Sequence, residues 1–166
     1  MRPGLNNSCH LRGPSCNARA MAAPATRPRR SRLRLADGPM LAEALAALAL
    51  ASLAIAFLPF RRVAAFASPS GRGPARTDPE TVRRARSAIT GWSRRVPWRA
   101  VCFQKGLALH WMLRRRGIRS VLLYGARRDG DGLAAHVWID VDGETVIGGE
   151  EAPNFACLAR FPPEAR

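Results

Sequence analysis

The sequence predicts an α+β fold, with helices in the first two thirds of the chain and a small antiparallel sheet in the last third. Apolar residues recur at helical spacing in residues 40–60, 79–93 and 101–117. Beyond Gly117 the pattern becomes short runs rich in Val, Ile and Leu, and Asp-Gly turns separate these runs as they do in β-hairpins. Helices followed by strands are typical of α+β domains, and 166 residues suffice for one modest core.

Residues 1–38 are predicted to form a disordered basic segment. They contain many arginines, scattered Pro, Gly, Ser and Asn, and no acidic residue before Asp37. Met21 and Met40 offer later translation starts. We therefore hypothesise that the natural product begins further along the chain, which the intact mass of the native protein would test.

Residues 39–68 are predicted to form an apolar helix, in which Glu43 is the only charge before Arg61. Nearly half of its uncharged run is Ala or Ser, which contribute little to membrane insertion, so we expect a helix packed on the core and not a membrane span. A signal peptide is disfavoured, because Arg61 and Arg62 separate the apolar run from the nearest cleavage-like sequence.

Residues 69–79 have the Pro, Gly, Ser and Arg composition of a linker, and residues 80–166 are predicted to form the main folded core. Thr77 or Asp78 can cap a helix that Pro79 opens.

Three strands are predicted. The first ends at Gly125, the second covers Leu133–Val141, and the third covers Glu144–Ile147 and pairs with the second through an Asp-Gly turn. In the tail, three apolar residues at helical spacing predict a short helix packed over the sheet, namely Phe155, Leu158 and Phe161.

The formal charge of +15 does not by itself predict a nucleic-acid-binding protein. Lys105 is the one lysine among 27 basic residues, so the other 26 are arginines, and they are spread along the chain. A solvated basic surface explains this distribution best, and it is compatible with an acidic peptide or acidic partner protein.

The cysteines and histidines do not predict a metal site or a disulfide framework. The four cysteines, at positions 9, 16, 102 and 157, form no Cys-x-x-Cys pair, and the three histidines are far apart in the sequence. A reducing, cytoplasmic location is the simplest interpretation.

Cys102 is predicted to lie in the first turn of its helix, where free N–H groups and the helix dipole stabilise a thiolate. A lone cysteine is more often a small buried hydrophobe, so this position alone is weak support for a nucleophile. His136 follows on the second strand, where it shares one face with Trp138 and Asp140. A histidine that reaches the sulfur would be the base of a Cys-His pair. His110, by contrast, is expected to be a structural histidine.

The stretch C-F-Q-K-G-L-A-L-H-W-M-L-R-R-R-G-I, then Y-G-A-R, then A-A-H-V-W-I-D-V-D-G-E-T-V-I-G-G resembles the transglutaminase-like leader peptidases of lasso-peptide biosynthesis, the B or split B2 proteins. The resemblance implies a transglutaminase-like, papain-like core and a Cys-His-Asp triad, of which the first two members map onto Cys102 and His136. The family's acid falls about where this chain has Gly148-Gly149. We predict Asp140 as the third residue, with Glu150 as the second choice.

The resemblance also implies partners. It suggests that this chain is the protease half of a split protein, which acts on a precursor peptide together with a separate leader-binding protein and an ATP-dependent lasso cyclase. No metal, cofactor or nucleic acid is expected, and ATP would belong to the cyclase, because the sequence has no Walker-type loop. Two alternatives remain open, which are an acyl-transferase or transpeptidase that uses the same Cys-His pair, and a non-catalytic scaffold.

Overall fold

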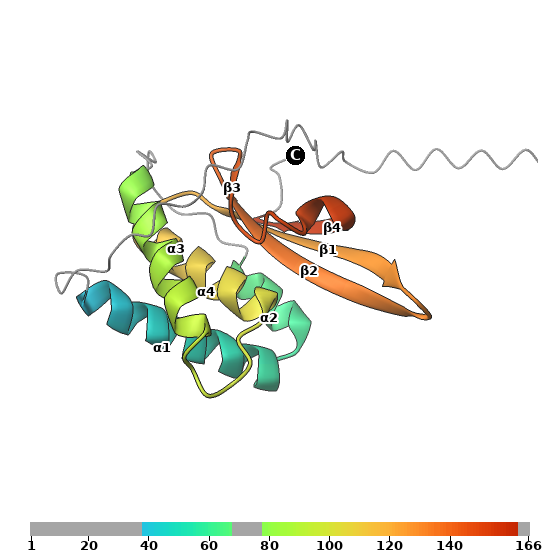
Figure 1. Ribbon diagram of the computed structural model, residues 1–166, viewed down its shortest axis with the longest axis horizontal. Coiled ribbons are helices and arrows are strands. Elements are labelled where there is room, and N and C mark those ends of the chain that lie inside the picture. Colours follow the sequence, from blue (N-terminus) through green and yellow to red (C-terminus); the bar gives the residue numbers. More distant parts are fainter. Residues whose placement is uncertain (1–37, 68–77, 163–166) are drawn as a thin grey trace, which may run out of the picture.

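The protein folds into a layer of helices against one antiparallel sheet, in the order α1, α2, α3, α4, β1, β2, β3, η2, β4 (Figure 1). This computed structural model describes residues 38–67 and 78–162. The predicted α+β class is confirmed. The predictions for residues 1–37 and for most of the linker lie outside the described residues.

The predicted apolar helix of residues 39–68 is two helices, α1 (Gly38–Phe57) and α2 (Phe60–Ala67). The break falls at Pro59, which has no N–H to donate and cannot continue a helix. The Leu58 N–H closes the end of α1 on the Ala54 carbonyl, and the Pro59 carbonyl accepts the first hydrogen bond of α2 from the Arg62 N–H. The chain can therefore turn, and α2 packs against α4.

Helix α1 packs against α3 (Pro79–Ser93) and α4 (Cys102–Arg115). By length and composition α1 is apolar enough to cross a membrane, and 22% of its most apolar window is buried inside the protein. Small residues form the buried face, which consists of Ala44, Ala47, Leu48 and Ala51. Polar contacts fix its position, because the Trp92 indole donates to the Leu41 carbonyl (2.9 Å) and the Arg116 guanidinium donates to both oxygens of Glu43.

Helix α3 begins, and helix α4 ends, at residues that capping rules favour. The Asp78 carboxylate accepts the Glu80 N–H at the start of α3, and Pro79 occupies the first turn. Gly117 follows α4 with φ +72°, and its N–H donates to the Arg114 carbonyl. The Ile118 N–H donates to the Leu113 carbonyl, which completes a Schellman motif that turns the chain toward the sheet.

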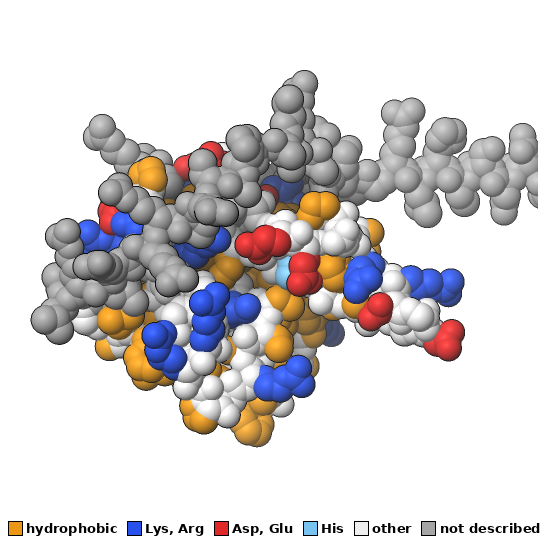
Figure 2. Space-filling model, viewed as in Figure 1, with side chains coloured by type: hydrophobic (Ala, Val, Ile, Leu, Met, Phe, Trp, Pro, Cys, Tyr) orange, Lys and Arg blue, Asp and Glu red, His pale blue; other side chains and the backbone are white. Residues whose placement is uncertain are grey.

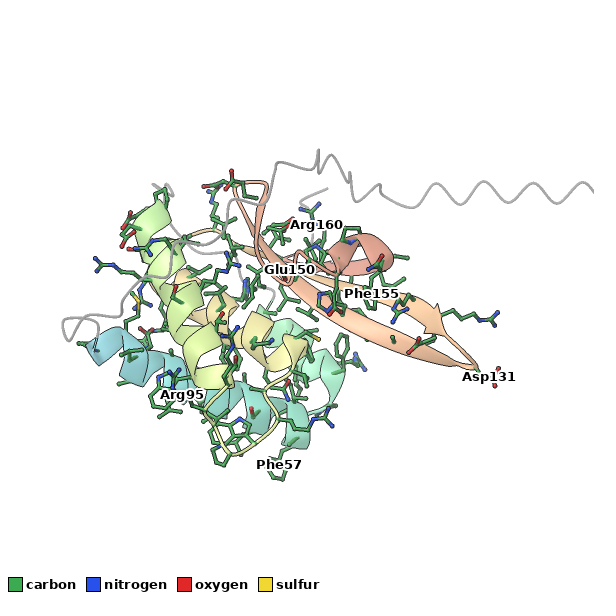
Figure 3. The ribbon with its side chains drawn as sticks, viewed as in Figure 1. Phe57, Arg95, Asp131, Glu150, Phe155 and Arg160 are labelled. Carbon is green, nitrogen blue, oxygen red and sulfur yellow. The ribbon has the colours of Figure 1, made fainter. Side chains whose placement is uncertain are left out.

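The sheet has the strand order β3-β2-β1-β4 and every pairing is antiparallel. Strands β1 (Val121–Asp129) and β2 (Gly132–Val141) form a long hairpin that extends beyond the helices, with Asp131 at its tip (Figure 3). Strand β3 (Glu144–Ile147) pairs with β2.

The tail prediction was wrong. A single 3-10 turn, η2 (Ala152–Asn154), leads into strand β4 (Ala156–Phe161), which pairs with β1. The edge of β1 offered unpaired backbone groups, and hydrogen bonding to them outweighed the apolar spacing that suggested a helix. As a result the segment after β3 crosses over to the opposite edge of the sheet before β4 begins.

Candidate active site

Cys102 is the first residue of α4, which starts within a few residues of the predicted position. Its N-cap residue is Val101, which makes no side-chain capping hydrogen bond. The first helical hydrogen bond at this end runs from the Lys105 N–H to the Val101 carbonyl, so the N–H of Cys102 itself has no helical acceptor. The cysteine is partly buried and free. Its sulfur therefore lies beside the positive end of an uncapped helix.

Two contacts fix the direction of α4 along β2. Gly106 lies over Val137, where a Cβ on the glycine would stand 2.7 Å from Val137 Cγ1. One turn further along the helix, His110 is hydrogen-bonded to Ser120, which directly precedes β1. Because β1 starts opposite Asp140, α4 runs from the His136 part of β2 toward the Asp140 part. Cys102, one turn before Gly106, therefore lies toward the end of the strand that carries His136.

His136 belongs to the other row of β2 side chains. Val137 and Ile139 face α4 and the core, whereas His136 stacks on Trp138 with ring centroids 6.1 Å apart, as the predicted alternation requires. The imidazole is 7% exposed. In the described part of the chain no hydrogen bond joins the Cys102 thiol to the His136 ring. A catalytic contact between them would have to tighten when substrate binds, as often happens in such sites.

Gly125 makes room for this arrangement. It pairs with His136 across β1 and β2, and a Cβ at Gly125 would stand 2.9 Å from both the Trp138 ring and the Ala156 carbonyl oxygen. The missing side chain lets the indole lie across β1 and support the imidazole.

The carbonyl of Gly148 fixes the tautomer of the neutral histidine. His136 Nε2 lies 2.8 Å from Gly148 O. A carbonyl oxygen can only accept, so Nε2 must carry the hydrogen, and in the neutral ring Nδ1 is left with the lone pair. The chain thus presents the Nδ1 atom as its base.

Glu151 and Phe155 also lie close to the His136 ring. Glu151 Oε2 is 4.0 Å from Nδ1, and the Phe155 ring centroid is 5.1 Å from the imidazole centroid. Both residues come from the crossover between β3 and β4, where Figure 3 labels Glu150 and Phe155. In Figure 2 a histidine surface is bordered by acidic side chains on this face.

The structure does not bring Asp140 to the histidine. Its Oδ1 accepts the Thr145 hydroxyl at 2.7 Å, and four residues along one strand separate its Cα from that of His136 by about 13 Å. Glu150, the second choice, is exposed and has no hydrogen bond or ion pair to His136 among the described residues. Asp140 and Glu150 stay predictions, and the carboxylate within ion-pairing distance of the ring is that of Glu151.

His110 is fully buried and holds two elements to α4. Its Nε2 lies 2.9 Å from Ala67 O at the end of α2, and its Nδ1 lies 2.9 Å from Ser120 Oγ. The carbonyl must accept from Nε2–H, so Nδ1 of the neutral ring accepts a hydrogen bond from the Ser120 hydroxyl. The pKa of His110 is lowered from 6.5 to about 4, mainly by burial; the Ala67 hydrogen bond acts in the opposite direction, and the Arg114 charge adds a smaller lowering. These contacts connect α4 to the end of α2 and to the residue before β1, and they lie away from the first turn of α4, which contains Cys102.

Within residues 38–67 and 78–162 no group of three or more His, Cys, Asp or Glu side chains could hold a metal ion.

The profile of the transglutaminase-like superfamily matches residues 40–160, which is well over half of the chain. The chain belongs to the transglutaminase-like superfamily. Members of this superfamily are generally cysteine peptidases or acyltransferases related to papain-like proteases, and membership supports an enzyme that works through a Cys-His pair. No curated protein and no solved structure gives a significant match to the chain.

Sequence reasoning missed two groups next to His136, which are the Gly148 carbonyl and the Glu151 carboxylate. A main-chain acceptor has no sequence signature. The Gly-Gly sequence at 148–149 is the one local signal of this backbone path, because Gly148 adopts φ +79°, which glycine favours. A Cβ there would stand 2.7 Å from Val137 O and 3.2 Å from His136 Nε2. With this backbone, no side chain fits at the position where the sequence resemblance places a triad acid.

Proposed function

We propose that this protein is a cysteine peptidase that removes the leader from a ribosomally synthesised lasso-peptide precursor, with Cys102 as nucleophile and His136 as base. The observation that carries the proposal is a cysteine at the uncapped start of α4 together with a histidine whose Nε2–H is held by Gly148 O, in a chain of the transglutaminase-like superfamily. The lasso-peptide assignment rests on the sequence resemblance around these residues.

The chemistry follows from the groups present. His136 Nδ1 takes the thiol proton of Cys102, and the thiolate attacks the carbonyl carbon at the junction of leader and core. The Cys102 N–H has no helical acceptor and is the donor that we propose for the developing oxyanion. The imidazolium then gives its proton to the leaving amine, and a thioester remains on Cys102. Water hydrolyses the thioester, with His136 again as the base.

We propose the partners that the resemblance implies. These are the precursor peptide, a separate small leader-binding protein and an ATP-dependent lasso cyclase, all in the cytoplasm. The basic surface suits an acidic leader segment or an acidic partner. Of the arginines on the described surface, Arg127 lies near the candidate site, with its guanidinium 5.3 Å from the centre of the Phe155 ring.

The decisive experiment incubates the precursor peptide with this protein and its leader-binding partner and follows the products by mass spectrometry. Three proteins are compared, which are the wild type, Cys102→Ala, and Cys157→Ala as a matched control at the other cysteine of the described residues. We expect cleavage at one bond by the wild type and by Cys157→Ala, and none by Cys102→Ala.

The alternatives give different results. Cleavage by Cys102→Ala at the wild-type rate would remove this residue from the mechanism. Precursor maturation that needs the folded protein but proceeds with Cys102→Ala would show a scaffold. A product that gains an added amine in place of water would show an acyl-transferase.

A further inference from the structure

We propose that the Gly148 carbonyl and the Glu151 carboxylate together replace the acid of the family's triad, with the carbonyl orienting His136 and Glu151 supplying the negative charge. This inference rests on the proposed function, because it assigns roles around the same histidine. Gly148 and Glu151 are positioning groups, since each acts through the imidazole.

The Gly148 carbonyl orients the His136 ring, which is one of the two roles of a triad acid. A triad acid accepts the hydrogen of one ring nitrogen and thereby leaves the other nitrogen as the base. Gly148 O likewise accepts the Nε2 hydrogen of His136 at 2.8 Å, so Nδ1 is left as the base. A neutral carbonyl, however, carries no net charge to stabilise the imidazolium that forms during the reaction.

Glu151 supplies that charge from the other side of the ring. Its Oε2 lies 4.0 Å from Nδ1, and the side chain is 69% exposed. An exposed carboxylate at this distance attracts the imidazolium and has no such attraction to the neutral ring. Because the carboxylate is exposed, its effect is expected to be small and sensitive to salt.

The remaining charges near the ring do not take this role. Arg127 lies over the ring of Phe155, which itself contacts the imidazole, so this aromatic ring separates the Arg127 guanidinium from His136. Asp140 is bound to Thr145, further along β2.

The backbone of this chain also leaves no room for a side-chain acid at position 148. Gly148 has φ +79°, and a Cβ would stand 2.7 Å from Val137 O. An aspartate at position 148 cannot be accommodated without moving the crossover between β3 and β4. The hydrogen-bond acceptor at this position must therefore be the main-chain carbonyl.

The first test follows the His136 ring by NMR in a Cys102→Ala background, which does not need catalysis. We compare Glu151→Gln with Glu150→Gln, a matched control on the preceding residue. At low ionic strength the ring of Glu151→Gln should give up its proton at a lower pH than the ring of Glu150→Gln, and about 1 M salt should remove the difference. Equal midpoints in the two variants at low salt would overturn the role of Glu151.

The same spectra test the carbonyl. The nitrogen shifts of neutral His136 should show the hydrogen on Nε2 in the parent and in both glutamine variants. Gly148→Ala should lose this preference, whereas Gly149→Ala should keep it, because a Cβ there meets only the Thr145 side chain, at 3.1 Å. A hydrogen on Nδ1 in the neutral parent ring would overturn the role of the carbonyl.

A kinetic readout then connects the pair to the reaction. In the active protein, Glu151→Gln should move the alkaline limb of kcat/KM to lower pH, because the imidazolium that protonates the leaving amine is lost earlier. Glu151→Asp should recover part of this shift. If no variant and no wild type cleaves any precursor, the proposed function fails while the NMR result still decides the placement of Gly148 and Glu151.

Discussion

Gly106 of α4 rests directly against Val137 of β2, so that a Cβ on the glycine would stand 2.7 Å from Val137 Cγ1 and 3.8 Å from Val137 Cβ. Real Cβ atoms are not found so close to a neighbour, and Val137 is 2% exposed and enclosed by the core. This contact sets how deeply the helix that begins at Cys102 seats on the sheet. It sits one turn from the cysteine and one residue from His136.

We expect Gly106→Ala to destabilise the protein by about 1–2 kcal/mol, because the clash in the core exceeds the gain of up to about 1 kcal/mol in helix propensity. Urea unfolding measures this, with Gly91→Ala in α3 as the control. The added Cβ at Gly91 meets only Arg95 Nη1 at an ordinary 3.5 Å, so this variant should be unchanged or more stable. Equal stability of the two variants would show that α4 can move away from β2 without cost.

Gly125→Ala should displace the Trp138 ring from His136. The new Cβ would stand 2.9 Å from two carbons of the indole and from Ala156 O. We expect an altered near-UV circular dichroism spectrum and at least about a tenfold lower kcat/KM, since misplacing a catalytic group by about 1 Å can cost 100-fold. Gly132→Ala is the control, because its Cβ would lie 3.6 Å from Asp129 O at the hairpin tip. A wild-type spectrum for Gly125→Ala would show that the indole isn't held by this glycine.

The ion pair of Glu43 with Arg116 should contribute to stability only above acidic pH. The hydrogen bond from Arg116 holds the pKa of Glu43 below 4.5, and the charges of Arg116 and Arg115 act in the same direction, against a smaller effect of burial. A depressed carboxyl pKa in the folded state adds stability that is present above pH 4.5 and is lost as the pH falls through the folded value.

Glu43→Gln should therefore lose about 1–2 kcal/mol at pH 7 and progressively less as the pH falls below 4.5, by denaturant unfolding across that range. Glu80→Gln removes ion pairs that are exposed and confined to α3, so we expect little change. A Glu43→Gln deficit that persists undiminished in acid would assign the loss to packing instead of charge.

His110 should make the protein less stable in mild acid. Burial lowers its pKa to about 4 from the ordinary 6.5, so the folded protein holds the neutral ring while the unfolded chain takes up a proton. Stability is complete above pH 6.5 and falls as the pH drops from there to about 4, by up to about 3 kcal/mol, the energy equivalent of a shift of that size.

The control for this prediction is His110→Gln, which cannot take up a proton in this range. It should be less stable than the wild type at pH 7, because the hydrogen bonds to Ala67 and Ser120 are altered. It should also show a flatter dependence of unfolding free energy on pH between 7 and 4. The same slope in both proteins would exclude His110 as the source.

Local patterns in the sequence determined much of this protein. The cap at Asp78, the Schellman end at Gly117 and the β2–β3 hairpin depend on neighbouring residues, and periodicity placed the helices and the first three strands. The shared face of His136 and Trp138 follows from alternation alone. The same local reasoning failed at Pro59, where a continuous apolar pattern hid a break between two helices.

The tertiary structure decided everything that depends on contacts between distant segments. Residues 156–161 became a strand because β1 had an open edge to pair with, which no pattern within those residues reveals. The partner of His136 is a main-chain carbonyl from twelve residues later in the chain, and its acidic neighbour is Glu151, not the predicted Asp140. A carbonyl can be recruited from any residue, so only the path of the backbone could show which one orients the histidine.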